Sequence, residues 1–311
     1  MSGYCFGIDV GGTTVKCGLF TSDGEMIEKW EIPTRSENNG SAILPDVAET
    51  ILAKVKERSL DKSEICGIGV GIPGPVRKGV AAVAVNLHWG EVNVAGILGE
   101  LTGLPVAVGN DANVAALGEM WKGAAEGKLN VILVTLGTGV GGGFIVDGKI
   151  VEGAHGAGGE IGHAHVDDCL TEKCNCGNFG CLEQFASATG IVRLAREALL
   201  TKPADEETTL VLSELSAKGV FDAYKRGDPT AARIVNKFAA YLGTALAVFS
   251  VAVDPGMIVI GGGVSKAGQP LIDAVEKYYR ERAFLPCKDT PIRLATLGND
   301  AGIYGAARLV L

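Results

Sequence analysis

The chain has 311 residues, of which 47% are hydrophobic and 21% are charged, and its formal net charge is −8 at pH 7. This composition is typical of a globular protein with room for two domains, and it excludes a disordered chain. The acidic balance argues against a protein that binds nucleic acid, which normally carries a basic face.

The first part of the chain predicts a strand meander followed by alternating helices and strands. Short apolar or alternating runs bounded by turn residues predict the strands, and apolar residues at helical spacing predict the helices. We expect strands over residues 4–9, 15–20, 25–32, 65–70, 80–85 and 105–108, and helices over 42–58, 94–102 and 112–122.

The second part repeats the opening pattern, because strands at 131–136 and 144–146 flank a glycine-rich turn as the first two strands do. We then expect helices over 187–200, 217–226, 229–253, 270–282 and 301–310, and strands over 257–260 and 292–296. Such alternation predicts α/β layers in which helices cover the sheets.

No segment of the sequence indicates a membrane or secretory protein. We find no continuous apolar run of the roughly 18 residues that a membrane span needs, and no signal segment before the first strand. We therefore expect a cytoplasmic protein without membrane contact. The eight cysteines are then more typical of metal ligands or buried thiols than of a disulfide framework.

A cysteine cluster follows a glycine-rich loop within residues 153–183. Three thiolates and one imidazole could complete a tetrahedron around one ion: His163, Cys174, Cys176 and Cys181. Such a closed set is the pattern of structural zinc, whereas catalytic zinc keeps one position open. Cys169 and His165 are rival ligands that spacing alone does not exclude.

Turns of glycine and threonine join strands at residues 11–14 and 137–139. Their backbone N–H groups and hydroxyls could form nests for phosphate oxygens, although either turn can also be purely structural. Asp9 ends the strand before the first turn, and a buried carboxylate is costly unless it is paired or near a cation. Mg²⁺ held through waters beside a nucleotide phosphate would supply that cation.

A third glycine cluster, residues 261–263, follows a strand and would let a flat ligand such as adenine approach the backbone. The alternative is a glycine-rich helix entry. Asp111 is similarly open to two interpretations, as a helix cap or as a carboxylate that deprotonates an alcohol. Asn113 lies where it could cap the helix in place of Asp111.

In this order the motifs resemble those of the ROK family, named for repressors, open reading frames and kinases, and within it the bacterial ATP-dependent glucokinases. The matching motifs are Asp9-Val10-Gly11-Gly12-Thr13-Thr14, Pro73-Gly74-Pro75-Val76, Asn110-Asp111-Ala112-Asn113, residues 135–143, Gly159-Glu160-Ile161-Gly162-His163, Cys174-Asn175-Cys176-Gly177 and Gly180-Cys181-Leu182-Glu183.

The resemblance implies an α/β protein with the actin-like ATPase fold, in which two duplicated ribonuclease-H-like domains have ATP and sugar meeting in the cleft between them. We expect a small domain of residues 1–116 and 298–311, with the first phosphate turn and the catalytic aspartate. Residues 117–297 would form a large domain with the second phosphate turn, the zinc loop and the adenosine loop.

The resemblance also implies individual roles, with Asp111 as the catalytic base on the sugar 6-hydroxyl. The other hydroxyls would be held by Asn86, Asn110, Glu160, His163 and Glu183. Phosphates and their Mg²⁺ would face Asp9, Gly11, Gly12, Thr13, Thr138 and Gly139, and adenosine would face Gly261 and Gly262. His163 would bind zinc through one ring nitrogen and sugar through the other. The loop at residues 86–90 varies in this family and helps set substrate choice.

The implied reaction transfers the γ-phosphoryl group of ATP to the 6-hydroxyl of glucose and gives glucose 6-phosphate and ADP. The resemblance also implies that the protein is a homodimer or homotetramer. One alternative is a kinase for another hexose or N-acetylhexosamine, such as N-acetylmannosamine, N-acetylglucosamine, fructose or allose. A sugar-binding transcriptional repressor is less favoured, because its helix-turn-helix module would have to precede the phosphate motif at Asp9.

Overall fold

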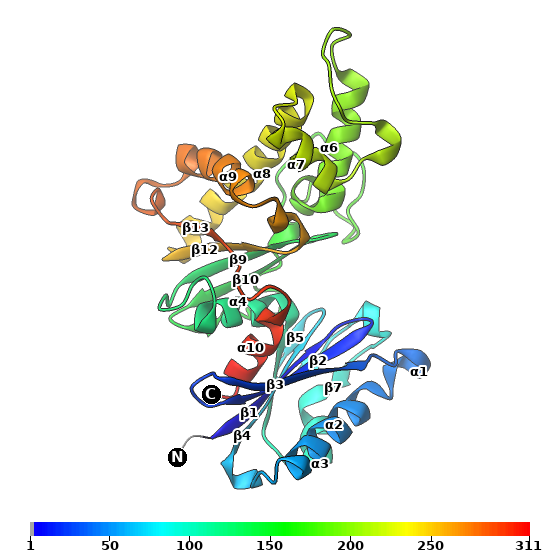
Figure 1. Cartoon of the computed structure of the whole chain (residues 1–311), viewed down its shortest axis with the longest axis vertical. Coiled ribbons are helices and arrows are strands. Elements are labelled where there is room, and N and C mark those ends of the chain that lie inside the picture. The colour runs from blue at the N-terminus through cyan, green and yellow to red at the C-terminus, as the bar shows by residue number, and fades with distance from the viewer. Residues whose placement is uncertain (1–2) are drawn as a thin grey trace. The chain divides into compact units, whose positions relative to one another are not determined.

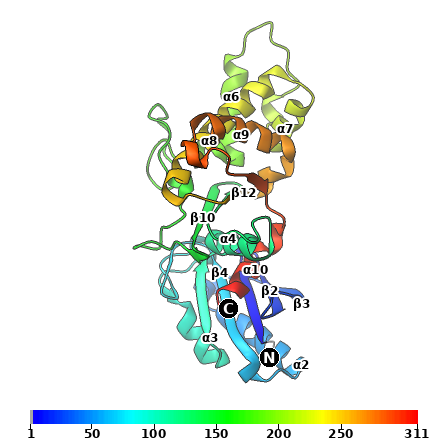
Figure 2. The same ribbon diagram turned by 90° about the vertical axis from the view of Figure 1, so that its left-hand side faces the viewer.

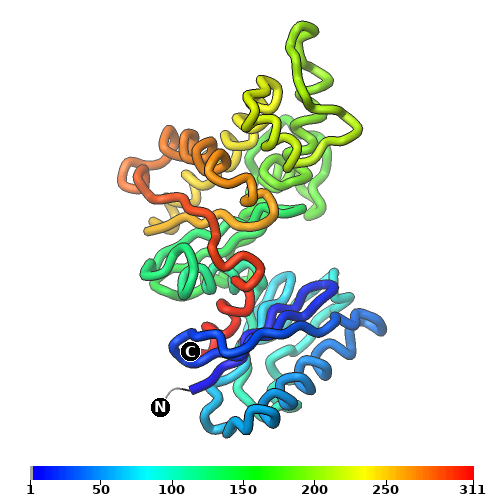
Figure 3. Tube along the Cα trace, viewed as in Figure 1, coloured from blue at the N-terminus to red at the C-terminus, as the bar shows by residue number. Residues whose placement is uncertain are grey.

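The computed structural model describes residues 3–311. The chain forms two compact units, and Figure 3 traces its path through them. Unit 1 comprises residues up to Leu129 together with Gly143–Gly159 and Thr296–Leu311, and unit 2 comprises Asn130–Gly142 and Glu160–Ala295. The two-domain boundaries expected from the resemblance stay a prediction.

Unit 1 is built on a five-stranded sheet of order β3-β2-β1-β4-β8. β1 (Tyr4–Val10), β2 (Thr14–Thr21) and β3 (Met26–Pro33) form the predicted antiparallel meander. β4 (Ile65–Ile72) and β8 (Val106–Asn110) extend the sheet in parallel beyond β1. The carboxyl ends of β1, β4 and β8 therefore meet at one edge, which is where ligands bind in open α/β sheets.

One face of this sheet packs against α2 (Ile43–Glu57) and α3 (Val94–Thr102). Phe6, Ile8 and Val10 of β1 are buried in the same apolar core as these helices. Their period of two places them on one face of the strand, as the pleat requires. Figures 1 and 2 show both helices on the same side of the sheet.

The opposite face is closed by α10 (Ala301–Arg308), which in turn packs on α4 (Asp111–Lys122). These layers approach so closely that side chains are excluded. A Cβ at Gly7 of β1 would lie 2.0 Å from a carbonyl oxygen of α10, and one at Gly305 of α10 would lie 1.7 Å from a carbonyl oxygen of α4. Small residues thus fix α4 and α10 as one layer under the sheet.

The prediction of a single strand over residues 80–85 is wrong. The segment belongs to a three-stranded antiparallel sheet of very short strands: β5 (Val76–Arg77), β6 (Val80–Ala81) and β7 (Val92–Asn93). Val83 and Val85 are 51% and 76% exposed, so the apolar run does not face a core. The remaining short elements of unit 1 are α1 (Glu37–Gly40), η1 (Lys62–Glu64), η2 (Val85–Leu87) and η7 (Gly298–Asp300).

The second sheet has the order β11-β10-β9-β12-β13. β9 (Val131–Leu136), β12 (Met257–Gly261) and β13 (Ile292–Leu294) are parallel. β10 (Val140–Val146) begins in unit 2 and continues into unit 1, where it pairs with β11 (Lys149–Ile150). The β9–β10 hairpin repeats the β1–β2 hairpin of unit 1, as the sequence predicted.

Helices make up most of the rest of unit 2: α5 (Glu183–Ala186), α6 (Ala188–Thr201), α7 (Ala217–Lys225), α8 (Pro229–Val253), α9 (Gln269–Arg282), η3 (Ile161–His163), η4 (Leu212–Glu214), η5 (Gly263–Ala267) and η6 (Leu285–Cys287). By length and composition alone α8 could cross a membrane, although Arg233 and Lys237 interrupt its apolar residues. However, 56% of its most apolar stretch is buried, and it packs against α6, α7 and α9. These contacts make α8 a core helix of unit 2.

Candidate active site

The N-terminus of α4 presents Asp111 directly after β8. Asn110 caps this helix, because its Oδ1 accepts hydrogen bonds from the N–H groups of Ala112 at 3.0 Å and Asn113 at 3.1 Å. Its Nδ2 donates to the carbonyl oxygen of Gly74 at 3.1 Å. Asp111 is half-buried, and its Oδ1 also accepts from the Ala112 N–H at 2.8 Å. The N-cap position therefore belongs to Asn110, and Asp111 is the first helical residue.

Asn113 does not cap the helix, so that interpretation is wrong. Its side chain is buried, and its Nδ2 donates to the carbonyl oxygen of Gly158 at 3.0 Å. Its Oδ1 has no hydrogen-bond partner among the residues that the structure describes. Gly158 closes the glycine-rich loop that precedes Glu160. Asn113 thus holds that loop on α4.

The first glycine turn, residues 11–14, joins β1 to β2 and is tied down by its own backbone. The Gly11 N–H donates to the Thr14 carbonyl oxygen at 3.0 Å, and the Thr34 hydroxyl donates to the Gly11 carbonyl oxygen at 2.7 Å. Gly12 is exposed, and a Cβ there would lie 3.6 Å from Cβ of Asn86. The structure therefore brings Asn86 beside the turn.

Asp9 lies half-buried near the end of β1. Its Oδ2 is 4.0 Å from Nζ of Lys16, and the start of α10 packs so closely that a Cβ at Gly302 would lie 2.6 Å from the same oxygen. Burial raises the pKa of Asp9, and the Lys16 ammonium partly opposes this effect. A cation bound nearby would stabilise the ionised carboxylate.

The four predicted metal ligands come together in unit 2. The candidate ligand atoms of His163, Cys174, Cys176 and Cys181 all lie within 4.8 Å of one another. Cys174 Sγ is 3.7 Å from His163 Nδ1, and Cys176 Sγ is 3.6 Å from Cys181 Sγ. Tetrahedral zinc with Zn–S bonds of about 2.3 Å separates its sulfurs by about 3.8 Å. The donors and their spacing fit such an ion.

Tight backbone turns bring the thiols together. The Cys174 N–H donates to the Asn178 carbonyl oxygen at 2.7 Å, and the Gly177 N–H donates to the Cys174 carbonyl oxygen at 2.9 Å. Gly177 and Gly180 have φ values of 92° and 67°, a conformation that only glycine adopts readily. The two glycines thus allow a compact cysteine knuckle over residues 174–181, which holds the three thiols together.

The rival ligands His165 and Cys169 are not part of this cluster. Both ring nitrogens of His165 already have partners: the Phe179 carbonyl oxygen at 2.9 Å and Asp168 Oδ1 at 2.8 Å. The hydrogen bond that His165 makes to Asp168 raises the pKa of His165. Cys169 is exposed. The structure therefore favours His163 as the metal ligand, because its imidazole, unlike that of His165, lies among the thiols.

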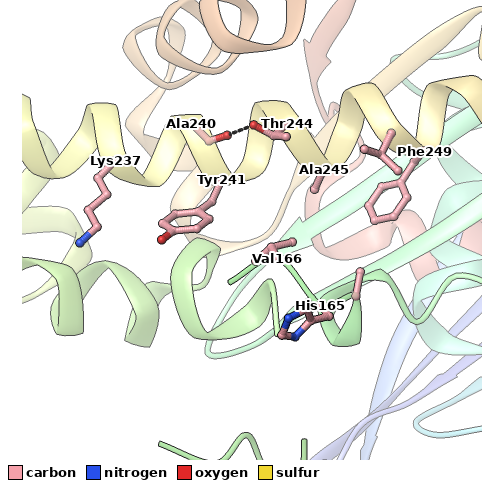
Figure 4. Close-up of a pocket in the computed structure, with 10 residues that line it drawn as sticks. His165, Val166, Lys237, Ala240, Tyr241, Thr244, Ala245 and Phe249 are labelled. Atoms are coloured by element: carbon pink, nitrogen blue, oxygen red, sulfur yellow. Dashed lines mark hydrogen bonds between the residues drawn. The ribbon is translucent and has the colours of Figure 1, made fainter. Parts of the chain in front are cut away.

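His165 lines a separate cavity of about 470 Å³ between α8 and residues 164–166 (Figure 4). Apolar groups such as Val166 and Phe249 form much of its wall, and the Tyr241 hydroxyl donates to Asp167 Oδ2 at 2.7 Å beside it. Its ten lining residues include none of the predicted site residues. This cavity is therefore not part of the candidate site.

Glu183 links the metal cluster to the second glycine turn. Its Oε2 accepts a hydrogen bond from the Val140 N–H at 3.0 Å, and its Oε1 lies 3.9 Å from Sγ of Cys174. A Cβ at Gly139 would lie only 2.0 Å from Oε2, so this carboxylate needs glycine at the turn. The metal cluster and the second glycine turn thus meet at Glu183.

The segment that carries Glu160 and His163 lies against the same strand. A Cβ at Gly162 would lie 2.1 Å from the Val140 carbonyl oxygen, so η3 packs directly on the start of β10. The His163 N–H donates to the Glu160 carbonyl oxygen at 3.1 Å, and Glu160 itself is half-buried. The two residues therefore belong to one short turn.

The second glycine turn and the third glycine cluster border one cavity of about 470 Å³ within unit 2. A Cβ at Gly262, whose φ is 82°, would lie 2.6 Å from the backbone of Leu136, so the cluster packs on the end of β9. The N-terminus of α6 supports the turn, because the Ala188 N–H donates to the Gly137 carbonyl oxygen at 2.8 Å. The cavity is lined by Gly137, Thr138, Ala188, Ala217, Lys218, Phe221, Asp222, Lys225, Gly263, Val264, Lys266 and Ala267.

Sequence reasoning missed the wall that α7 contributes to this cavity. Lys218, Phe221, Asp222 and Lys225 all line it, and Lys218 Nζ is 2.5 Å from Asp222 Oδ2. Positions i, i+4 and i+7 share one face of a helix, so the charged residues of α7 were a usable signal. Gly261 and Gly262 lie just before Gly263, which lines the cavity.

The predicted residues thus form one group in each unit. Unit 1 holds Asp9, Gly11, Gly12, Thr13, Asn86, Asn110 and Asp111. Unit 2 holds Thr138, Gly139, Glu160, His163, Cys174, Cys176, Cys181, Glu183, Gly261 and Gly262. Within each group, the features that the sequence separated by tens of residues lie together.

The chain is similar to known proteins over nearly its whole length. The ROK family profile matches residues 5–311. A protein named glucokinase from Halalkalibacterium halodurans is 44% identical over 310 residues, which cover 98% of this chain and 94% of that protein.

Two solved structures are similar over nearly the whole chain. The crystal structure of a ROK hexokinase from Thermus thermophilus has a TM-score of 0.82 and 34% identity, covering 98% of this chain and 97% of that one. The crystal structure of a ROK family glucokinase from Streptomyces griseus, in complex with glucose and AMPPNP, has a TM-score of 0.73 and 30% identity, covering 99% of both chains. The actin-like ATPase fold expected from the motifs is confirmed.

Proposed function

The chain belongs to the ROK family, and on this basis we propose that it is a cytoplasmic glucokinase. It transfers the γ-phosphoryl group of ATP to the 6-hydroxyl of glucose and releases glucose 6-phosphate and ADP. The observation that carries the proposal is the start of α4, where Asn110 caps the helix and Asp111 is left at its first turn. The similarity to a glucokinase over nearly the full length supports glucose as the sugar.

Asp111 acts as the general base. Phosphoryl transfer asks the protein mainly for positioning and charge neutralisation, so one correctly placed carboxylate suffices to accept the proton of the 6-hydroxyl. Asp111 stands at the N-terminus of α4, where the positive end of the helix dipole lies. As the new O–P bond forms, the hydroxyl proton moves to Asp111 and the bond to the β-phosphate oxygen breaks.

The remaining sugar hydroxyls are bound by amide, carboxylate and imidazole groups: Asn86, Asn110, Glu160, His163 and Glu183. Three of these are supported by their proximity in unit 2, because Glu160 and His163 share a turn and Glu183 contacts the adjacent strand. Such groups pair with hydroxyls as donors and acceptors. A substrate that lacks one hydroxyl would leave a polar group unpaired, which gives the site its specificity.

Nucleotide binding involves both glycine turns and the third glycine cluster. Phosphate oxygens face Gly11, Gly12, Thr13, Thr138 and Gly139, and adenosine lies near Gly261 and Gly262. The cavity bordered by Thr138 and Gly263 supports this placement. Mg²⁺ would be held beside Asp9 through waters, and it would neutralise the phosphate charge.

We assign Zn²⁺ to the four-ligand cluster as a structural ion. The ion would fix the orientation of the His163 ring and the knuckle around it. Because Nδ1 faces Cys174 at 3.7 Å, the cluster leaves Nε2 of His163 for a sugar hydroxyl. No protein ligand would be displaced during the reaction, since a Cys3His set is closed.

A coupled assay of ADP release across several sugars tests the proposal. We expect kcat/KM to be highest for glucose and lower for fructose, allose, N-acetylglucosamine and N-acetylmannosamine. A preference for an N-acetylhexosamine would reassign the substrate, and no turnover with any of these sugars would overturn the kinase assignment. Analytical ultracentrifugation of the same sample tests the proposed homodimer or homotetramer.

A further inference from the structure

The chain passes between the two units four times, at residues 129/130, 142/143, 159/160 and 295/296. Any motion of one unit against the other has to bend the chain at these connections. Their ends in unit 1 are far apart in sequence. Residues beside the last three connections nevertheless contact α4, the helix that begins with Asp111, and the first connection follows α4 closely along the chain.

The first and last connections are held by Glu119, whose carboxylate is fully buried. Its Oε2 accepts hydrogen bonds from the N–H groups of Ala124 at 2.8 Å and Thr296 at 3.2 Å, and from the Thr296 hydroxyl at 3.4 Å. Its Oε1 accepts from the Leu297 N–H at 2.8 Å. Residues 123–129 lead into the first connection, and Thr296 directly follows the last.

These hydrogen bonds satisfy the oxygens of the buried side chain, and the ion pairs described within residues 3–311 do not include Glu119. A buried carboxylate is costly unless its oxygens are bonded in this way. The fit is also tight, since a Cβ at Gly123 would lie 2.1 Å from Oε2. Glu119 therefore ties the C-terminal half of α4 to the backbone at Thr296 and Leu297.

The other two connections contact the first half of α4. A Cβ at Gly143 would lie 2.7 Å from Cβ of Ala116 and 3.0 Å from the Ala112 carbonyl oxygen, so the second connection starts in direct contact with the helix. The third is held by the hydrogen bond from Asn113 to Gly158, at 3.0 Å.

We propose that α4 is the common anchor of all four connections and that Glu119 is a positioning residue for phosphoryl transfer. Glu119 lies about two helical turns from Asp111 on the same rigid helix. Through these contacts it would hold the connections against the helix whose first turn carries the proposed base. The kinetic part of this inference rests on the proposed kinase function, whereas the anchoring itself does not.

Glu119→Gln tests the anchor because it keeps the size of the side chain but turns its NH₂ toward backbone N–H donors. The hydrogen-bond partners of Glu119 include no residue proposed to bind glucose or ATP. We therefore expect the KM values to stay within about threefold while kcat falls about tenfold or more, since a 1 Å misplacement can cost about 100-fold. Hydrogen exchange at the amides of Ala124, Thr296 and Leu297 should become faster.

Thr102→Val is the matched control. Thr102 is a buried polar residue of α3 in unit 1, and its hydroxyl donates to the Leu98 carbonyl oxygen at 2.6 Å, away from the connections. It should lower the melting temperature without lowering kcat or changing exchange at Thr296 and Leu297. Glu119→Asp keeps the carboxyl group but shortens the side chain, so its kcat should lie between those of Glu119→Gln and the wild type. If Glu119→Gln does not fold, hydrogen exchange of Glu119→Asp at the same three amides provides the test.

An unchanged exchange rate at the three amides overturns the anchor, and so does an equal loss of kcat in Thr102→Val. If the wild-type protein phosphorylates no sugar, the proposed function fails, yet the exchange rates still decide whether Glu119 holds the connections.

Discussion

The start of α4 and the cysteine knuckle organise polar side chains in opposite ways. At α4, Asn110 makes hydrogen bonds to Ala112, Asn113 and Gly74, so protein groups alone define the position of Asp111. In the cysteine knuckle, the ligand atoms of the three thiols and the imidazole all lie within 4.8 Å of one another. The first region is complete as protein, whereas the second converges on a point that an ion would occupy.

The thiol pKa values sharpen this contrast. Burial raises the pKa of Cys174, and it raises the pKa of Cys181 to about 12. A backbone hydrogen bond from Asn178 lowers the pKa of Cys176. Thiols held this close resist ionising together unless a cation compensates their charge. Metal binding therefore has to displace protons, and metal affinity should fall as the pH falls.

Substituting a metal ligand in the cysteine knuckle should have the largest effect on stability. Cys176→Ser removes one of four ligands, so we expect zinc content to fall from about one ion per chain to near zero. The loss of stability should be several kcal/mol, below the roughly 10–16 kcal/mol of isolated zinc peptides. Elemental analysis and thermal melting measure both. Cys169→Ser, an exposed thiol outside the cluster, is the matched control and should change neither.

Breaking the base should affect kcat and leave the fold intact. Asp111→Asn keeps the size of the side chain but removes the proton acceptor, so kcat should fall by about 10²–10⁴-fold. Because Asn110 provides the cap, the melting temperature should stay close to wild type. Activity within a few-fold of wild type would remove Asp111 from catalysis.

Removing the helix cap should lower stability, which removing the base is not expected to do. Asn110→Ala removes the acceptor for two helix N–H groups, which should lower the free energy of unfolding by about 0.5–2 kcal/mol. Denaturant unfolding of Asn110→Ala beside Asp111→Ala measures the difference. If Asp111→Ala costs as much stability as Asn110→Ala, the two residues share the cap.

The smallest predicted effect concerns Asp9, whose pKa burial raises. Between the unfolded value of about 3.9 and the raised value, the folded state binds more protons, so this group's contribution to stability falls as the pH rises through that window. Asp9→Asn should therefore be more stable than wild type at neutral pH, and the difference should vanish as the pH falls below about 4. Melting curves across this range, without nucleotide or Mg²⁺, provide the measurement. A constant difference at every pH would contradict it.

Strong local patterns made much of the fold predictable. The bounds of α3, β9 and α8 match the predicted ones because long apolar periodicities and clear turn residues mark them. The two-residue strands between residues 76 and 93 could not be predicted, since strands this short form only through their pairing. Sequence composition says little about such pairings.

The site divides in the same way. Cysteine spacing identified the metal cluster, because ligand spacing is a local property. Choosing the cap among Asn110, Asp111 and Asn113 was beyond the sequence, since all three residue types can cap and only the backbone geometry decides. From the sequence alone, Glu119 would be taken for an ordinary surface residue. The structure buries it through contacts with Thr296 and Leu297, which lie far along the chain.

Calorimetric titration of glucose and of a non-hydrolysable ATP analogue tests the contrast between the two regions most directly. The samples are the zinc-loaded protein, the zinc-stripped protein and Asp111→Asn. We expect stripping to weaken glucose binding about tenfold or more, because metal-fixed ligand orientation is typically worth 10–100-fold, and to change nucleotide binding little. Asp111→Asn should bind both ligands nearly as the wild type does. Equal loss of both ligands on stripping, or unchanged glucose binding, would contradict a metal-organised sugar site.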